Sequence, residues 1–273
     1  MRPGLARGLV ELRQSFTGPE LLGQLLWPAV SLVALVLLQH RDVGADGITW
    51  GAFAVPGVVA MFVALGMLLD VQQVSADRED GTVLRAKATP DGVRGYLVGK
   101  LVTVSLTVLV YVAIVLVGGA LLVDGVDLRT VDWATFAWVL ALGLVATRSL
   151  GLVLGALVRS SRGAGYVSLP VVGLIAVSGL LAPVTALAAG WQALAQVFPV
   201  YWLGLGMRSA FLPDAAAAVE LGGSWRPLQT AAVLGAWAVA GLVLAPATLR
   251  RMTRGESGSR VAAGRERALQ RVG

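Results

Sequence analysis

The longest charged run between two apolar segments is ADREDGTVLRAKATP, residues 76–90. Its acids come first and its bases follow, an order that suits the dipole of a short helix. Pro90 then ends the helix or begins the next turn. The pattern predicts a short helix that lies flat on the cytoplasmic face of a membrane, where it is available to dock a partner.

Asp70 and Arg148 are charged residues that lie within apolar segments. Arg148 precedes Arg159 by eleven residues, which places it about 16 Å deeper along a helix. A charge at such a depth costs about 2.5–3.5 kcal/mol on insertion scales, so it needs a partner, protein or water around it. A structural Asp70–Arg148 pair and an Arg148 that lines a substrate path are both open, and we favour the structural role.

The residue types that usually carry catalysis are scarce. The chain has no cysteine and one histidine, His40, and it contains no G-x-S-x-G, H-E-x-x-H or EF-hand pattern. The segment GYLVGKL, residues 95–101, is one residue short of a Walker A loop and lacks its hydroxyl. We therefore expect no catalytic or metal site, no directly bound cofactor and no enzymatic activity in this chain.

The composition indicates a membrane protein: 56% of the residues are hydrophobic and 14% are charged, with a mean hydropathy of +0.77. Apolar runs of about twenty residues must be helical in lipid. We expect an all-α membrane protein whose transmembrane domain, residues 21–249, has six transmembrane helices. These are predicted at residues 21–38, 52–75, 96–123, 133–158, 166–187 and 228–249.

Loop charges set the predicted orientation. With both termini inside, 17 of the 22 Lys and Arg residues lie on inner segments and four lie on outer ones. This bias accounts for the net charge of +6 without a nucleic acid partner. Residues 1–20 fit an interfacial amphipathic helix, with a solvated N-terminus as the alternative, and residues 250–273 form a basic cytoplasmic tail.

Residues 188–227 are apolar and aromatic, and Pro199 and Pro213 interrupt them. The pieces are too short to cross a bilayer, so we expect short re-entrant or interfacial helices between spans five and six. The alternative is a poor span at residues 191–211, which would give seven spans and reverse the C-terminus. The basic tail argues against it. Separately, Gly151 and Gly155 form a small-xxx-small pattern that predicts close helix packing within the bundle.

Two motifs resemble the ABC-2 type family of transporter permeases, closest to the daunorubicin-resistance kind of drug exporter. The first is the family's E-R-E-x-G-T motif with a later proline, matched by Asp77-Arg78-Glu79-Asp80-Gly81-Thr82 and Pro90. Leu84 and Ala86 depart from it, where the family has Glu and Leu. The second runs through Leu169-Pro170, Ser178-Gly179-Leu180 and Pro183 to Pro199, Tyr201 and Arg208.

The resemblance implies a permease subunit of an ATP-binding cassette exporter in the bacterial cell membrane. Two six-helix halves, identical or different, would each rest on a separate ATPase subunit, which would hold ATP and Mg. The segment at residues 76–90 would be the coupling helix, and the cargo would be amphiphilic or lipid-like. The residues implied in coupling are Asp77, Arg78, Glu79, Gly81, Thr82, Leu84 and Pro90.

Two other classes compete with this interpretation. A secondary transporter or channel driven by an ion gradient would need more intramembrane carboxylates than Asp70, or half-helices at midplane in both halves. A polytopic membrane enzyme would need a nucleophile with its base, or a metal set, and the sequence shows neither. Association with an ATPase subunit distinguishes the exporter from both.

Overall fold

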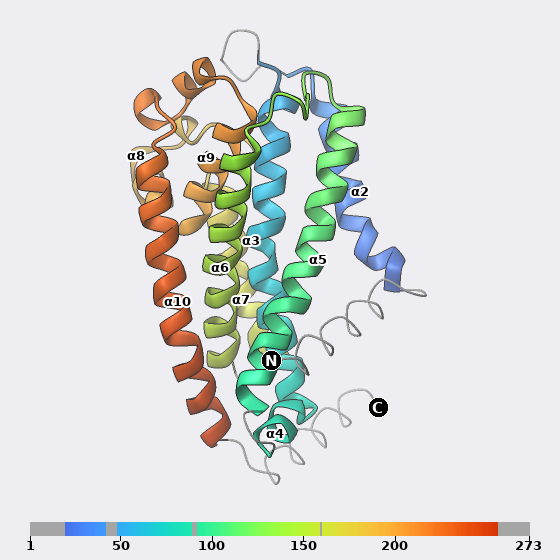
Figure 1. Ribbon diagram of the computed structural model, residues 1–273, viewed down its shortest axis with the longest axis vertical. Helices are drawn as coiled ribbons and strands as arrows, with labels where there is room; N and C mark the ends of the chain where they lie inside the picture. Colours follow the sequence, from blue (N-terminus) through green and yellow to red (C-terminus); the bar gives the residue numbers. More distant parts are fainter. Residues whose placement is uncertain (1–19, 42–47, 89–91, 159, 256–273) are drawn as a thin grey trace.

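The computed structural model describes residues 20–41, 48–88, 92–158 and 160–255, and all its regular elements there are helices (Figure 1). The predicted interfacial helix, almost all of the basic tail and Pro90 lie outside the described residues. The helices are α2 (Glu20–Leu38), α3 (Trp50–Glu79), α4 (Thr82–Lys87), α5 (Gly92–Leu122), α6 (Trp133–Leu157), α7 (Ser161–Val177), α8 (Ala189–Val197), α9 (Pro199–Phe211) and α10 (Pro227–Gly255).

Helix α3 is the centre of the bundle. It packs against α6, α5, α9, α7 and α2, while α10 packs on α6 and α9 (Figure 1). Its first turn is capped by Thr49, whose Oγ1 accepts a hydrogen bond from the amide of Ala52. Most of its side chains are buried, among them Phe53 and Val63. A helix that is apolar on every side belongs in the interior of a bundle, as α3 does.

Glycines let α3 and α6 approach each other closely. A Cβ on Gly66 of α3 would lie 1.9 Å from the guanidinium of Arg148, and one on Gly151 of α6 would lie 2.8 Å from the Cβ of Asp70. Gly155, one turn further along α6, faces Val74 and Val71 in the same way. The predicted use of Gly151 and Gly155 for close packing within the bundle is therefore confirmed.

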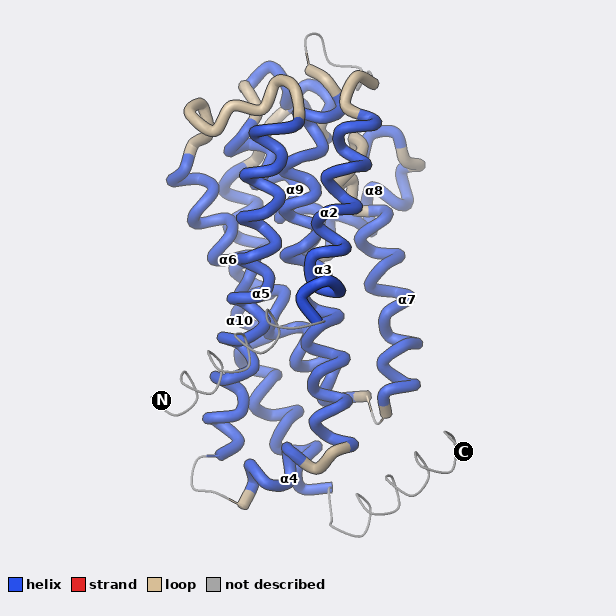
Figure 2. Tube along the Cα trace, turned by 90° about the vertical axis from the view of Figure 1, so that its right-hand side faces the viewer, coloured by secondary structure: helices blue, strands red, loops and turns tan. Residues whose placement is uncertain are grey.

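Helix α7 is shorter than the predicted fifth span at residues 166–187. It starts at Ser161 and ends at Val177, because Gly179 adopts a φ of +66° that turns the chain out of the helix. Its 17 residues extend about 25 Å, less than the roughly 30 Å of a bilayer core. Figure 2 shows α7 running along the bundle and ending below α8.

Two short helices follow instead of one long span at residues 191–211. Helix α8 ends before Phe198, and Pro199 occupies the first turn of α9, where its missing N–H costs nothing. Helix α9 is buried along almost its whole length and packs on α6, α3 and α10. The two 3-10 helices Asp214–Val219 and Leu221–Gly223 then lead to α10.

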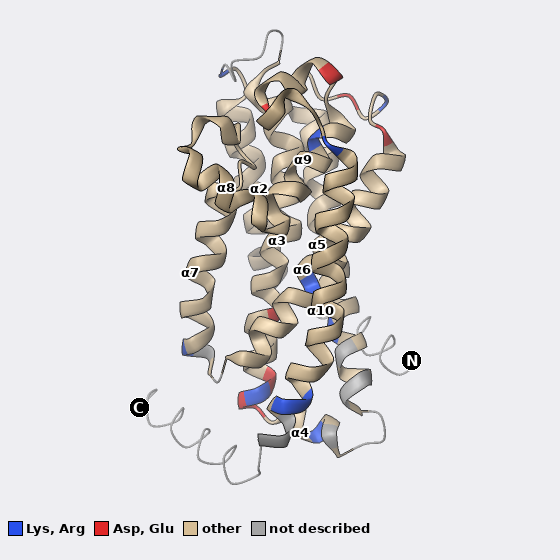
Figure 3. Ribbon diagram, turned by 90° about the vertical axis from the view of Figure 1, so that its left-hand side faces the viewer, with Lys and Arg blue, Asp and Glu red and all other residues tan. Residues whose placement is uncertain are grey.

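Five of the described helices are long and apolar enough to cross a membrane: α2, α3, α5, α6 and α10. The prediction of six such helices is thus not confirmed, because α7 is apolar but too short. Large apolar side chains such as Leu22, Tyr166 and Leu228 remain exposed on the outside of the bundle. Charged residues gather at its two ends, with few between them (Figure 3).

The ends of the long helices extend beyond the predicted spans. Helix α3 continues past residue 75 to Glu79, and α5 begins at Gly92 rather than at residue 96. Helix α10 continues past Leu249, where Met252 is still buried. On the α3 extension, Asp77 is close enough to α5 to form an ion pair, as described below.

The contact between α3 and the turn after α7 gives a test of the packing. A Cβ on Gly57 would lie 1.7 Å from the carbonyl oxygen of Leu180, which is backbone and moves only with its chain. Gly57→Ala should therefore lower the free energy of unfolding by about 1–3 kcal/mol, measured by thermal unfolding in detergent.

The matched control is Gly235→Ala in α10, where a Cβ would meet nothing within 4 Å. It should be neutral or stabilise the protein by about 0.5–1 kcal/mol, because alanine favours a helix over glycine. Equal effects of the two substitutions would contradict the close approach.

Candidate functional site

The predicted coupling segment is a helix end, a tight turn and a short helix. Asp77, Arg78 and Glu79 belong to the last turn of α3, and α4 begins only at Thr82. The expectation that the acids open the short helix is therefore wrong. The reason is that α3 remains helical as far as Glu79, so that Asp77 and Glu79 lie at a helix C-terminus.

The turn between the two helices depends on Gly81. Its φ of +79° lies in the left-handed region, which favours glycine over every other residue. The carboxylate of Asp80 accepts a hydrogen bond from the amide of Thr82 at 2.8 Å, and Arg85 donates to the Thr82 hydroxyl at 2.9 Å. These contacts fix the angle between α3 and α4.

The side chains of this segment divide into a buried and an exposed set. Thr82 and Val83 are buried, and Leu84 is half-buried. Val83 packs in a small apolar core with residues of α3, α5, α6 and α10. Glu79, Asp80 and Arg85 are exposed. The exposed set forms a charged surface at one end of the bundle. We call this end of the bundle the α4 end.

Asp77 and Arg78 point into the bundle. Asp77 forms an ion pair with Lys100 of α5 at 2.8 Å and accepts a hydrogen bond from the Tyr96 hydroxyl at 2.9 Å. Arg78 donates to the carbonyl of Val158, at the end of α6, at 2.8 Å. These two motif residues tie α3 to its neighbours, which the motif alone did not indicate.

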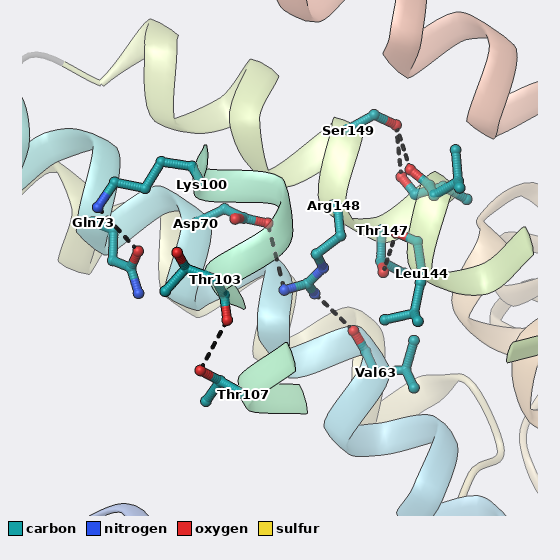
Figure 4. Close-up of polar contacts among 12 residues, drawn as sticks. Val63, Asp70, Gln73, Lys100, Thr103, Thr107, Leu144, Thr147, Arg148 and Ser149 are labelled. Atoms are coloured by element: carbon teal, nitrogen blue, oxygen red, sulfur yellow. Dashed lines mark hydrogen bonds and ion pairs between the residues drawn. The ribbon is translucent and has the colours of Figure 1, made fainter. Parts of the chain in front are cut away.

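Asp70 and Arg148 lie side by side in the middle of the bundle (Figure 4). The Nη1 atom of Arg148 is 3.4 Å from a carboxylate oxygen of Asp70, and its Nη2 atom donates to the carbonyl of Val63 at 2.8 Å. Arg148 and Asp70 are each 1% exposed. The structure therefore contains the ion pair that the sequence left as one of two interpretations.

The hydrogen bonding of this pair is incomplete. Among the described groups, neither carboxylate oxygen of Asp70 accepts a hydrogen bond, and Nε of Arg148 donates none. A buried ion pair repays its loss of hydration only with good geometry and further hydrogen bonds. The pair holds α3 and α6 in register. The carboxylate oxygens of Asp70 remain able to accept further hydrogen bonds.

A second buried ion pair lies at the opposite end, which we call the α9 end. Nε of Arg208 donates to Glu220 at 2.6 Å, and Nη1 donates to the carbonyl of Gly179 at 3.0 Å. The same guanidinium lies 4.7 Å from the ring centroid of Phe53. Arg208 therefore joins α9 to α3, to the turn after α7 and to the 3-10 segment.

Tyr201 is fixed at the same end. Its hydroxyl accepts a hydrogen bond from Arg226, which also donates to the side-chain carbonyl of Gln196 at 3.1 Å. The Arg226 guanidinium lies 4.8 Å from the centroid of the Trp202 ring, a cation–π contact. Pro199, Tyr201 and Arg208, grouped in the sequence, thus all lie on α9, and the last two anchor it.

Several of these partners were missed from the sequence. Lys100 falls inside the predicted span at residues 96–123, as Asp70 and Arg148 fall inside theirs. Glu220 is an isolated acid in an apolar stretch, AAAAVELGG at residues 215–223. In both cases the available signal was a lone charge in apolar surroundings.

The charged groups described here either join helices or lie at the surface. The buried charges pair with each other and join helices, and the exposed charges form a surface at the α4 end. Within the described ranges, no group of three or more His, Cys, Asp or Glu side chains is placed to hold a metal ion.

Comparison with known families matches the chain to the family described as ABC-2 family transporter protein, over residues 44–246. The match covers most of the chain, from shortly before α3 to Pro246 within α10. The chain belongs to the ABC-2 family. A search of curated proteins gave no match. Its family membership and its long apolar helices together identify this ABC-2 protein as a multi-pass membrane protein with a role in transport.

The buried pair of this ABC-2 protein can be tested by removing one or both charges. Arg148→Met leaves the Asp70 carboxylate buried without a counter-charge, and should lower the free energy of unfolding by about 3–5 kcal/mol. The double variant Asp70→Asn with Arg148→Met removes both charges and should lose clearly less, by thermal unfolding in detergent. A double variant as unstable as the sum of the single ones would contradict the pairing.

The α9 end is tested by a substitution that retains the charge. Arg208→Lys cannot contact both Glu220 and the Gly179 carbonyl, because an ammonium lacks the planar fork of guanidinium. Thermal unfolding should show a loss of about 1.5–3 kcal/mol. Arg129→Lys, at an exposed loop position, is the control and should change nothing measurable. An unchanged stability of Arg208→Lys would show that the charge alone is sufficient.

Proposed function

We propose that this chain is the transmembrane permease subunit of an ATP-binding cassette exporter. It would move an amphiphilic or lipid-like substrate, including drugs, outward with energy from ATP hydrolysed on a separate subunit. The family membership and the long apolar helices support the transport role. The sequence lacks a Walker A loop, which agrees with a nucleotide site on another chain.

The observation that carries the proposal is the α4 end. Glu79, Asp80 and Arg85 are exposed there, while Val83 of the same turn is anchored in a core that reaches four long helices. A charged surface with both signs suits recognition of a protein partner. Because Val83 anchors this surface in the core, a force on the surface is transmitted to the helices of the bundle. These are the properties that a contact with an ATPase subunit requires.

The proposed machine has two permease halves, identical or different, and two ATPase subunits that hold ATP and Mg. The exposed apolar side chains of α2, α7 and α10 are available to lipid and to the second half. In this proposal the chain lies in the bacterial cell membrane, with the α4 end and both termini in the cytoplasm. Closure of the ATPases would displace the α4 end and change the cavity between the halves.

The test is association with the ATPase subunit and its dependence on the α4 end. Glu79→Lys reverses a charge on the proposed contact surface. It should reduce co-purification of the ATPase about tenfold. Like charges that face each other across a contact weaken binding by about a kcal/mol or more. The membrane fold should be unchanged in size-exclusion chromatography.

Asp124→Lys is the matched control, because it makes the same change of charge at an exposed position at the α9 end. It should leave the association intact. Equal co-purification by both variants would contradict the proposed contact surface. Export that persists without the ATPase and follows an ion gradient would instead support a secondary transporter.

A further inference from the structure

A line of charges of alternating sign runs from the middle of the bundle to the α4 end. It begins at Arg148, continues through Asp70 and Lys100 and ends at Asp77. Arg148 pairs with Asp70 at 3.4 Å, and Lys100 pairs with Asp77 at 2.8 Å. Asp70 and Asp77 are seven residues apart on α3, so they share a face about 10.5 Å apart.

Lys100 stands between the two carboxylates. Its ammonium donates a hydrogen bond to the side-chain oxygen of Gln73, at 3.2 Å, and Gln73 lies between Asp70 and Asp77 along α3. Figure 4 shows Lys100 and Gln73 on one side of Asp70 and Arg148 on the other.

The surroundings make these interactions strong. The side chain of Lys100 is 10% exposed and that of Asp77 is 15% exposed. Charges in such a site interact more strongly than in water, and a charge without its partner is costly. The threonines next along α5, Thr103 and Thr107, each donate to a backbone carbonyl of their own helix.

Asp70 can accept a second cation. Both its carboxylate oxygens are buried, and neither accepts a hydrogen bond from a group that the structure describes. Lys100 contacts Asp77, the carboxylate nearer the α4 end, and Asp70 lies two turns away on the same face of α3. Two discrete pairings of one ammonium are a two-state element of the kind that conformational coupling needs.

The α4 end is linked directly to this element. Val83 of α4 packs in the same core as Val74 of α3 and Tyr96 of α5. Tyr96 in turn donates to Asp77. Displacement of α4 therefore acts on the segment that holds the Asp77–Lys100 pair.

We propose that Lys100 is a positioning residue that switches between Asp77 and Asp70. In the structure it pairs with Asp77, and Asp70 is left to Arg148. When a partner displaces the α4 end, Lys100 moves to Asp70 and loosens the contact between Asp70 and Arg148, which releases α6 from α3. This inference rests on the proposed function, because it takes the ATPase as the source of the displacement.

The test uses the complex with its ATPase in lipid nanodiscs. The chain has no cysteine, so within it spin labels attach only at introduced positions. Labels at Val117→Cys in α5 and Val145→Cys in α6, both on exposed side chains, report the distance between these helices. In the otherwise native complex, ATP with vanadate should change this distance.

Lys100→Met should abolish the change while the complex assembles and hydrolyses ATP. Lys100→Arg should retain it, and Arg129→Met, at an exposed loop, is the control. A Lys100→Met complex that responds like the native one would overturn the switch. A native complex that assembles but does not respond would likewise overturn the switch, whereas a chain that fails to assemble with the ATPase would overturn the proposed function itself.

The charge swap Asp77→Lys with Lys100→Asp separates a switch from a simple tie between helices. It restores an ion pair between the same two positions, so assembly and thermal stability should return to near the native values. It also places a carboxylate opposite Asp70, where only a cation can pair. The distance change should therefore stay absent, and its recovery in the swapped protein would overturn the proposal.

Discussion

The structure depends on the cost of a charge in an apolar interior. Arg148 has no route to water, so its position is determined by Asp70 and the Val63 carbonyl. That contact fixes how α6 lies on α3, and it is possible only because Gly66 leaves room for the guanidinium. Hydrophobic packing alone is not directional and tolerates sliding between smooth helices, whereas an ion pair selects one register.

The same constraint operates at both ends, and α3 takes part each time. At the α9 end, the guanidinium of Arg208 lies against Phe53 of α3. At the α4 end, Asp77 of α3 pairs with Lys100. Charged contacts at three heights therefore determine how the neighbouring helices lie around one central helix, and the apolar residues fill the space between them.

The sequence predicts the features of this fold that follow from composition. It does not predict where helices end or which way individual side chains point. Long apolar runs predicted six spans, and five of them are membrane-length helices. A lone carboxylate with a lone guanidinium indicates the central pair. The end of α7 was missed, because the turn at Gly179 lies within an apolar run. The inward orientation of the Asp77 side chain was missed too. The order of charges in a sequence does not show where a helix ends or which neighbouring helix a side chain faces.

The short helix α4 makes the role of α3 clearer. Six residues are too few to form a stable helix in water, so the shape of the α4 end must be imposed from outside it. The left-handed Gly81 turn joins it to α3, and Val83 anchors it in the core below. The exposed charges of this surface are therefore carried rigidly by α3, whose own position is fixed by buried ion pairs. A partner that moves the surface must strain or rearrange those pairs.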